Sequence, residues 1–316
     1  MSNIKVILLG LNYSKNKNLK LEGCINDIYD FRDIFIDKFK IKSHNIEMYH
    51  DYSKIKPTRL NIIKILNRVV KEVNNSKLID TLWIHYSGHG FCTLDYDGDE
   101  NGLNDKINGD GEDGFDEMIT TLDAEYIKDD QFNDIFSKLL PKKKLIAIFD
   151  CCHSGTILVL PYKYDYIYDR LVKDNTKYNK IVCDAILLSG CKDTQKSESQ
   201  NGILKNNKYN GAFSSALIKC LKKNIYLSID SILEEISKYL KYNRFLQEPQ
   251  ISSTISINKN TKLFYIDPCQ EILNLKLSEY NNIISFCKKY LNNNIRYKKY
   301  LDYYTKKRNI LITLIN

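Results

Sequence analysis

Two short segments of this chain carry residue types that could perform nucleophilic catalysis. Residues 87–90 are Ser-Gly-His-Gly, and residues 150–155 are Asp-Cys-Cys-His-Ser-Gly. A thiol becomes an effective nucleophile when a nearby imidazole takes its proton, and backbone N–H groups can stabilise the oxyanion that forms after attack. The glycines leave the backbone of both segments open to a close approach. This chemistry requires that the chain bring the two segments together.

The elements that precede the two segments give a reason to expect this. Each segment follows an apolar run typical of a buried strand, at residues 81–86 and 144–149. In an open α/β sheet, functional residues lie beyond the carboxyl ends of the strands, and neighbouring strands are about 4.8 Å apart. Two such strand ends can hold a thiol and an imidazole at working distance.

The wider pattern alternates apolar strands with amphipathic helices. We therefore predict an α/β fold with a mostly parallel central sheet of about six strands and helices on both faces. The predicted strands lie at residues 4–9, 45–49, 81–86, 144–149, 185–188 and within 250–266. The predicted helices lie near residues 24–39, 57–73, 129–139, 211–223 and 230–242. Residues 161–182 are rich in Tyr and Lys without a clear period, and we expect an irregular surface segment there.

Composition favours a globular protein of a reducing compartment. Of 316 residues, 43% are hydrophobic and 27% are charged, as in ordinary soluble proteins. The nine cysteines are an odd number without a paired framework, and the N-terminus lacks the apolar segment of a secretory signal. No run approaches the roughly 18 to 20 apolar residues of a transmembrane helix. We expect a cytoplasmic protein with no transmembrane segment and a monomeric state.

The net charge of +8 is unevenly distributed. Residues 269–316 hold nine Lys or Arg against three Asp or Glu, whereas residues 95–117 hold ten acidic residues against Lys106 alone. We interpret residues 269–316 as a basic, helical C-terminal extension that packs on the protein, in preference to a membrane or nucleic-acid contact. No nucleic-acid partner is expected.

The two segments resemble the signature motifs of metacaspases, the caspase-like cysteine peptidases of clan CD and peptidase family C14. The similarity runs from residue 4 to about residue 266. Further similar segments occur in the family's order at residues 23–27, 97–100, 112–117, 160–162, 189–193, 211–213 and 249–252. The resemblance implies a caspase-like sandwich at residues 1–268, without the N-terminal prodomain of some relatives because the first strand begins by Ile4.

The resemblance also implies the catalytic roles. His89 matches the general base, Cys152 matches the nucleophile, and the N–H groups of Gly90 and Cys152 match the oxyanion hole. Cys151 stands where many relatives have serine, and we assign it no catalytic role. His85 is interpreted as a buried strand residue, and His153 as a turn residue.

Metacaspases cleave after Arg or Lys, so the resemblance implies polypeptide substrates with a basic residue at the cleavage site. The matching specificity positions are Cys24, Asp27, Ser87 and Asp150. Asp27 and Asp150 could bind a guanidinium through charge-assisted hydrogen bonds. The alternatives are a charge at a helix N-terminus for Asp27 and a turn cap for Asp150. Self-cleavage in the basic stretches has Lys163, Arg170, Lys173 and Lys205 as candidate sites.

Many relatives require calcium, which four aspartates bind. Asp116, Asp129 and Asp130 match three of them, but Val159 stands at the fourth position, and a valine cannot ligate a hard cation. Spare carboxylates occur in the acidic segment 95–117, at Asp97, Asp99, Asp110 and Asp113. We therefore expect a weakened Ca²⁺ site, and the alternative is a solvated acidic loop.

The alternatives for the chain as a whole are a caspase-like scaffold and a nucleotide-binding domain. A catalytically silent caspase-like scaffold would act through protein contacts, but it has no need for both His89 and Cys152. A nucleotide-binding doubly wound domain would need a glycine-rich phosphate loop after the first strand, and residues 10–12 (Gly-Leu-Asn) do not form one. A metal site at Cys151, Cys152 and His153 is excluded by geometry, because adjacent residues cannot converge on one tetrahedral ion.

Overall fold

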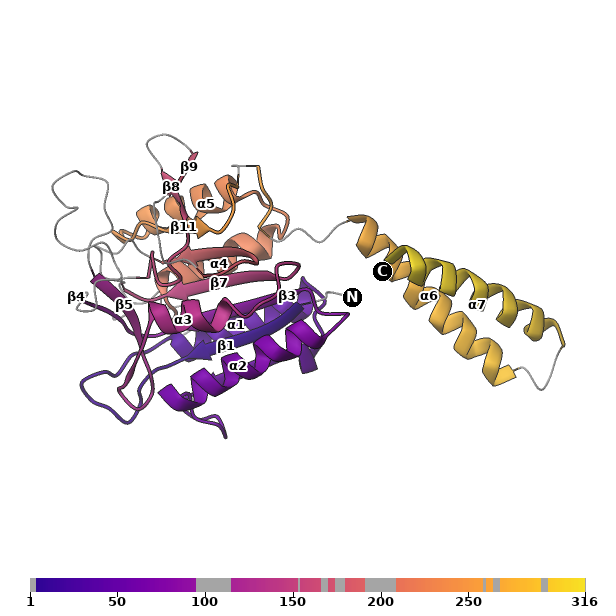
Figure 1. Ribbon diagram of the computed structural model, residues 1–316, viewed down its shortest axis with the longest axis horizontal. Helices are drawn as coiled ribbons and strands as arrows, with labels where there is room; N and C mark the ends of the chain where they lie inside the picture. Colours follow the sequence, from indigo (N-terminus) through magenta and orange to yellow (C-terminus); the bar gives the residue numbers. More distant parts are fainter. Residues whose placement is uncertain are drawn as a thin grey trace. The chain divides into compact units, whose positions relative to one another are not determined.

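The computed structural model describes residues 4–94, 115–152, 154–165, 170–173, 180–190, 209–257, 260–263, 268–290 and 295–315. The described residues fall into two compact units, which lie within Asn3–Leu263 and Phe264–Asn316. Figure 1 shows both units.

The first unit is built on an eight-stranded sheet with the order β2-β1-β3-β7-β10-β11-β8-β9. Its strands are β1 (Ile4–Gly10), β2 (Ile46–His50), β3 (Thr81–Ser87), β7 (Lys144–Asp150), β8 (Tyr162–Asp165), β9 (Arg170–Lys173), β10 (Asp184–Ser189) and β11 (Gln250–Ser253). The five strands from β2 to β10 are parallel to their neighbours, and the pairings of β11, β8 and β9 are antiparallel. The prediction of a mostly parallel sheet is confirmed.

The sheet is larger than the six strands expected from the sequence. The two extra strands, β8 and β9, come from residues 161–182, where we expected an irregular segment; β8 pairs with β11, with Lys163 opposite Ser252. Strands at the end of a sheet need not be buried on both faces, so their sequences carry no continuous apolar run. The Tyr- and Lys-rich composition therefore concealed them.

Helices cover both faces of the sheet, as predicted. They are α1 (Cys24–Asp37), α2 (Arg59–Asn75), α3 (Asp129–Phe136), α4 (Ala212–Lys223) and α5 (Ile229–Tyr242), with a short 3-10 helix η1 (Ser43–Asn45) before β2. Side chains of α2 and α3 share a buried core with alternate residues of β1, β3, β7 and β10. The opposite face of β3 meets α1, where the ring of Phe31 lies 4.3 Å from that of His85 and Phe35 lies 4.6 Å from Trp83.

A second, three-stranded antiparallel sheet has the order β4-β5-β6. Its strands are β4 (Gly90–Leu94), β5 (Phe115–Thr120) and β6 (Tyr126–Lys128). It begins one residue after His89 and ends where α3 begins at Asp129. The small sheet therefore links the histidine segment to the aspartates at the start of α3.

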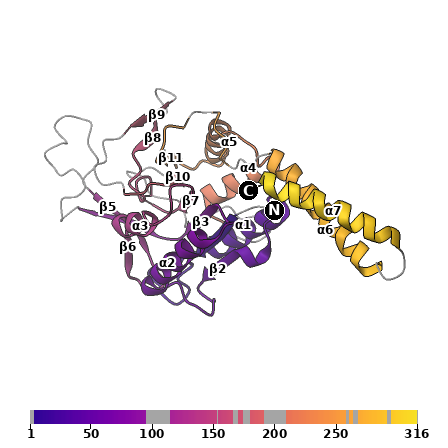
Figure 2. The same cartoon turned by 45° about the vertical axis from the view of Figure 1, so that its right-hand side comes forward.

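The second unit consists of α6 (Pro268–Tyr290) and α7 (Ile295–Ile315), which lie side by side in both views (Figure 1 and Figure 2). Ile284 and Cys287 of α6 are buried. Within the described residues, none of the helices has the length and hydrophobicity that crossing a lipid bilayer would need.

Candidate active site

The histidine and cysteine segments emerge from two adjacent strands at the same level. β3 and β7 are parallel partners, and Ser87 is paired with Asp150 at their ends. Just beyond, the N–H of Gly88 lies 3.4 Å from the carbonyl oxygen of Asp150. His89 lies two residues after Ser87, and Cys152 lies two residues after Asp150. The register therefore puts His89 and Cys152 beyond the carboxyl ends of two neighbouring strands.

The backbones of the two segments touch at Gly90. A Cβ atom built on Gly90 would lie 2.1 Å from the carbonyl oxygen of Cys152 and 3.1 Å from Sγ of Cys151. Real Cβ atoms do not come so close to a carbonyl oxygen, so only glycine allows this contact. Gly90 thus joins the end of the histidine segment to the backbone of Cys152.

The two adjacent cysteines have different surroundings. Cys151 is fully buried in the core, and Cys152 is partly exposed. A thiol that attacks a substrate must be accessible to it, so Cys152 is the one that can serve as nucleophile. The neighbouring His153 lies outside the described residues.

The backbone and ring of His89 are held by three partners that the sequence analysis did not identify. Nε2 of His89 lies 2.9 Å from the carbonyl oxygen of Leu19. Its main-chain N–H donates to the hydroxyl of Tyr13 at 3.1 Å, and its carbonyl accepts from the hydroxyl of Tyr86 at 2.8 Å. A carbonyl can only accept, so Nε2 carries the proton and donates to Leu19, which leaves Nδ1 free to act as a base. Burial lowers the pKa of His89, although the bond to Leu19 opposes this, so the ring is neutral at physiological pH.

Tyr13 and Tyr86 form a buried tyrosine pair. Their hydroxyl oxygens lie 3.0 Å apart, and both also reach the carbonyl oxygen of Thr120, at 2.8 and 2.9 Å. Tyr13 is also one of the few residues other than glycine with a left-handed backbone (φ 50°). Such a conformation is maintained by its surroundings, here the hydrogen bonds of its hydroxyl and its packing on His89.

A pair of buried carboxylates lies beside the cysteine segment. Asp27 in α1 is fully buried and Asp150 is 5% exposed. Asp27 accepts hydrogen bonds from neutral donors: the Ser87 hydroxyl at 2.8 Å, the Asn210 amide at 3.0 Å and the Gly211 N–H at 3.0 Å. Asp150 accepts from the N–H of Ser214 at 2.9 Å. The structure thus brings together Asp27, Ser87 and Asp150.

Burial and mutual repulsion dominate the electrostatics of this carboxylate pair. Burial, followed by repulsion from Asp150, raises the pKa of Asp27 to about 8, and its hydrogen bonds only partly oppose this. Cys24, the fourth specificity position, is buried, and its thiol pKa is raised by burial and then by Asp27. Cys24 is therefore an uncharged wall, and a cation brought to Asp27 and Asp150 would relieve their repulsion.

Three residues that bond to the carboxylate pair were not predicted from the sequence: Asn210, Gly211 and Ser214. They lie just before and in the first turn of α4, whose N-terminal N–H groups point at the two carboxylates. A helix N-terminus favours negative charge, which helps to keep both groups there. Two of the three act through backbone atoms, so the sequence holds little signal for them.

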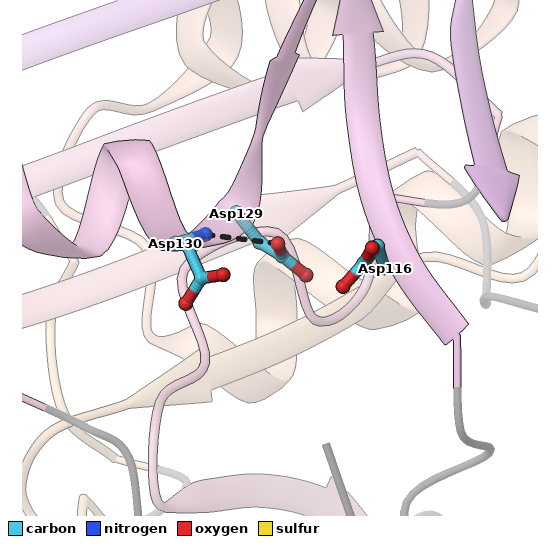
Figure 3. A group of neighbouring side chains, drawn as sticks. All are labelled: Asp116, Asp129 and Asp130. Carbon is cyan, nitrogen blue, oxygen red and sulfur yellow. Dashed lines mark hydrogen bonds between the residues drawn. The ribbon is translucent and has the colours of Figure 1, made fainter. Parts of the chain in front are cut away.

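Asp116, Asp129 and Asp130 meet at the junction of β5 and α3, and we call them the acidic cluster (Figure 3). One ligand atom from each lies within 4.8 Å of the others. Asp129 accepts from the N–H of Glu117 at 3.0 Å and from that of Asp130 at 2.8 Å. Burial, opposed by these bonds and helped by the neighbouring carboxylates, raises the pKa of Asp129 to about 7.

The acidic cluster fits a hard divalent cation in ligand type, because carboxylate oxygens are the ligands that Ca²⁺ prefers. Within the described part of the chain, Oδ1 of Asp116 is buried and has no hydrogen-bond partner. Two features oppose a strong site. The side chain of Val159 is buried and has no oxygen that could act as a ligand, and the ammonium group of Lys128 forms an ion pair with Asp116. The spare carboxylates at residues 97–113 lie outside the described residues.

Comparisons with known proteins identify the family of this constellation. The family described as "Metacaspase, peptidase C14 domain" matches residues 4–161. Metacaspase-1 from Saccharomyces cerevisiae is 31% identical over 81% of this chain and 67% of its own length, and Metacaspase-1 from Schizosaccharomyces pombe is 31% identical over 81% and 68%. The crystal structure of protein GSU0716 from Geobacter sulfurreducens shares the fold, with a TM-score of 0.53 at 22% identity over 82% of this chain and 99% of that one.

Proposed function

Because the chain belongs to the metacaspase family of C14 peptidases, and is thus a cysteine-type endopeptidase with polypeptide substrates, we propose that it cleaves after Arg or Lys with Cys152 as nucleophile and His89 as base. Membership in a peptidase family also favours an enzyme over the silent scaffold and the nucleotide-binding domain. The observation that carries the proposed specificity is the buried carboxylate pair, in which Asp27 accepts hydrogen bonds only from neutral donors among the described residues.

The proposed reaction proceeds through an acyl-enzyme. Nδ1 of His89 takes the proton of the Cys152 thiol, while Nε2 keeps its hydrogen bond to the carbonyl of Leu19. The thiolate attacks the substrate carbonyl, and the N–H groups of Gly90 and Cys152 stabilise the oxyanion. Protonated His89 then gives its proton to the leaving amine as the C–N bond breaks. Water activated by His89 hydrolyses the thioester and restores the free thiol.

The carboxylate pair would select the residue before the cleaved bond. A guanidinium or ammonium beside Asp27 and Asp150 replaces the repulsion between two buried carboxylates with attraction. An Asp side chain in the same place would add a further negative charge to the pair. The proposed preference is therefore for Arg or Lys, with Arg favoured where two hydrogen bonds can form in parallel.

Asp116, Asp129 and Asp130 are the residues that would hold calcium. A bound cation would offset their mutual repulsion at the junction of β5 and α3. β5 is paired along its length with β4, which directly follows His89. We propose that calcium activates the enzyme by fixing this small sheet and, through it, the position of His89.

Self-processing is the last part of the proposal. Lys163 lies in β8, and Arg170 and Lys173 lie in β9, while Lys205 lies outside the described residues. A peptidase binds its substrate as a free extended segment, so cleavage at the first three sites requires β8 and β9 to separate. Mass spectrometry of the wild type and of Cys152→Ala after incubation with calcium would locate the cleavage sites.

A peptidase assay tests the central proposal. Fluorogenic peptides that end in Arg, Lys or Asp are given to the wild type, with calcium or a chelator, and to Cys152→Ala. We expect cleavage of the Arg and Lys peptides, no cleavage of the Asp peptide, and loss of about 10³-fold or more in Cys152→Ala. Equal cleavage by Cys152→Ala would overturn the assignment of the nucleophile, and activity unchanged by a chelator would remove calcium from the mechanism.

The specificity is tested by Asp27→Asn. The loss of a charge-assisted hydrogen bond should lower kcat/KM for the Arg peptide by about 10–100-fold. Asp33→Asn is the matched control, because Asp33 lies on the same helix and is exposed. If the two variants behave alike, Asp27 does not recognise the substrate.

A further inference from the structure

The ammonium group of Lys128 already provides a positive charge at the acidic cluster. Lys128 is the last residue of β6 and precedes Asp129, and its ammonium group is ion-paired with Asp116. The side chain of Asp116 is 1% exposed, whereas that of Lys128 is 38% exposed. The lysine thus reaches from the surface onto a buried carboxylate.

This ion pair compensates only part of the negative charge of the acidic cluster. One ammonium charge offsets one of three carboxylates that lie within 4.8 Å of one another. Figure 3 shows the carboxylates of Asp116 and Asp129 turned toward each other. Oδ1 of Asp116 stays buried without a hydrogen-bond partner in the described part of the chain. A divalent cation could contact several of these oxygens at once.

We propose that Lys128 is a built-in competitor for the divalent cation. Without calcium, its ammonium group reduces the repulsion within the acidic cluster and keeps the junction of β5 and α3 folded. When calcium binds, the ammonium group moves to solvent, which its long and partly exposed stem permits without a change in the backbone. This inference rests on the proposed calcium site and not on the proposed peptidase mechanism.

The consequence is a weak but switchable site. Calcium has to displace Lys128 from Asp116 before it can use that carboxylate, so the lysine raises the calcium concentration that half-fills the site. The absence of a ligand at Val159 lowers the affinity further. The chain would thus respond only to high calcium, while its fold would not depend on calcium.

The test is calcium binding by Lys128→Met, which keeps the length of the stem and removes the charge. The backbone N–H of Lys128 donates to Gln131 at the start of α3, and this bond survives the substitution. Isothermal titration with calcium chloride is done in a Cys152→Ala background, so that self-cleavage cannot interfere. We expect the dissociation constant to fall by about 10-fold or more, since one full charge is removed from the site.

Two further variants sharpen the test. Lys180→Met removes a lysine that pairs with Asp134 of α3, where both side chains are 60% exposed, and it should bind calcium like the parent. Lys128→Arg keeps the competing charge and should retain weak binding. The melting temperature of Lys128→Met without calcium should lie below that of the parent and should rise more when calcium is added.

Two outcomes would overturn the inference. One is equal or weaker calcium binding by Lys128→Met, and the other is no heat of binding in any of the proteins. Either result leaves the peptidase proposal standing, because cleavage of the Arg peptide and its loss in Cys152→Ala are measured separately. Conversely, loss of the peptidase proposal would not alter the calcium titrations.

Discussion

The hydroxyl of Tyr13 accepts a hydrogen bond from the main-chain N–H of His89 at 3.1 Å, although 76 positions separate the two residues. Their rings are also in contact, with centroids 5.1 Å apart. On the other side of the histidine, Tyr86 donates to the carbonyl at 2.8 Å. The tyrosine pair therefore fixes the backbone of His89 on both sides, while Leu19 fixes the ring.

Tyr13→Phe should lower kcat much more than it raises KM. The substitution leaves the N–H of His89 without its acceptor and loosens the base, while the carboxylate pair is untouched. We expect kcat on the Arg peptide to fall by about 10–100-fold and the free energy of unfolding to fall by about 1–2 kcal/mol. The rate at which iodoacetamide alkylates Cys152 should fall as well, because a displaced imidazole activates the thiol less.

The control for Tyr13→Phe is Tyr29→Phe. Tyr29 is 38% exposed in α1, so removal of its hydroxyl should leave kcat, KM and the alkylation rate unchanged. A folded Tyr13→Phe enzyme with the kcat of the wild type would show that the tyrosine pair stabilises the fold only.

Gly211→Ala should weaken recognition of Arg without unfolding the protein. Gly211 has φ −60° and ψ 144°, a conformation that alanine adopts freely. Its new Cβ, however, would lie 2.3 Å from Oδ2 of Asp150 and 3.0 Å from Oδ2 of Asp27. We expect kcat/KM for the Arg peptide to fall by about 10-fold or more, because the carboxylates must move apart. Ser215→Ala, one turn into α4 and partly exposed, is the control, and equal kinetics of the two variants would contradict the prediction.

The strands that carry the catalytic segments could be predicted closely from the sequence. The predicted strands at residues 81–86 and 144–149 correspond to β3 and β7, each one residue longer. Both are buried on two faces, so they appear as continuous apolar runs. His85 is fully buried in β3, as expected for a strand residue that takes no part in catalysis.

The partners of the catalytic residues could not be predicted in the same way. Leu19 acts through its carbonyl and Gly211 through its N–H. Every residue has a backbone carbonyl and every residue except proline has an N–H, so the sequence does not distinguish these two positions. Tyr13 acts through a hydroxyl, but 23 tyrosines in the chain give no reason to choose it. Lys128 is adjacent to Asp129 in the sequence, but it is the pairing of β6 with β5, with Lys128 opposite Met118, that brings its ammonium group to Asp116. Such contacts depend on tertiary structure and leave no periodic pattern.

The affinity of the carboxylate pair for a guanidinium should rise with pH. Without a bound cation, burial and repulsion from Asp150 raise the pKa of Asp27 to about 8, and we therefore expect the pair to hold a proton at neutral pH. A bound guanidinium lowers that pKa and expels the proton, so binding becomes stronger as the pH rises toward 8. We expect affinity for agmatine, an arginine analogue without the carboxylate, to rise by at most about 10-fold per pH unit between about pH 6 and about pH 8.

Calorimetry with Cys152→Ala measures this linkage directly. Titrations of agmatine in buffers of different ionisation enthalpy give the number of protons released, which should approach one near neutral pH. The release should vanish in Asp27→Asn and persist in Asp33→Asn. Binding that is independent of pH, without proton release, would show that both carboxylates are already ionised before agmatine binds.

Acid should unfold this protein partly through His85. Burial lowers its pKa to about 3 in the folded state, against about 6.5 in the unfolded chain. Above pH 6.5 neither state binds the proton, but below it the unfolded chain does, so stability is lost by at most about 1.4 kcal/mol per pH unit down to about pH 3. The variant His85→Phe keeps an aromatic ring against Phe31 but has no group to protonate. In urea unfolding, the free energy of unfolding of the wild type should therefore fall by about 2–3 kcal/mol more than that of His85→Phe when the pH is lowered from about 7 to about 4.5. The control is His44→Gln, because His44 is exposed, and its stability should depend on pH as that of the wild type does. If the stability of His85→Phe also depends on pH in this way, His85 is not the group that takes up the proton on unfolding.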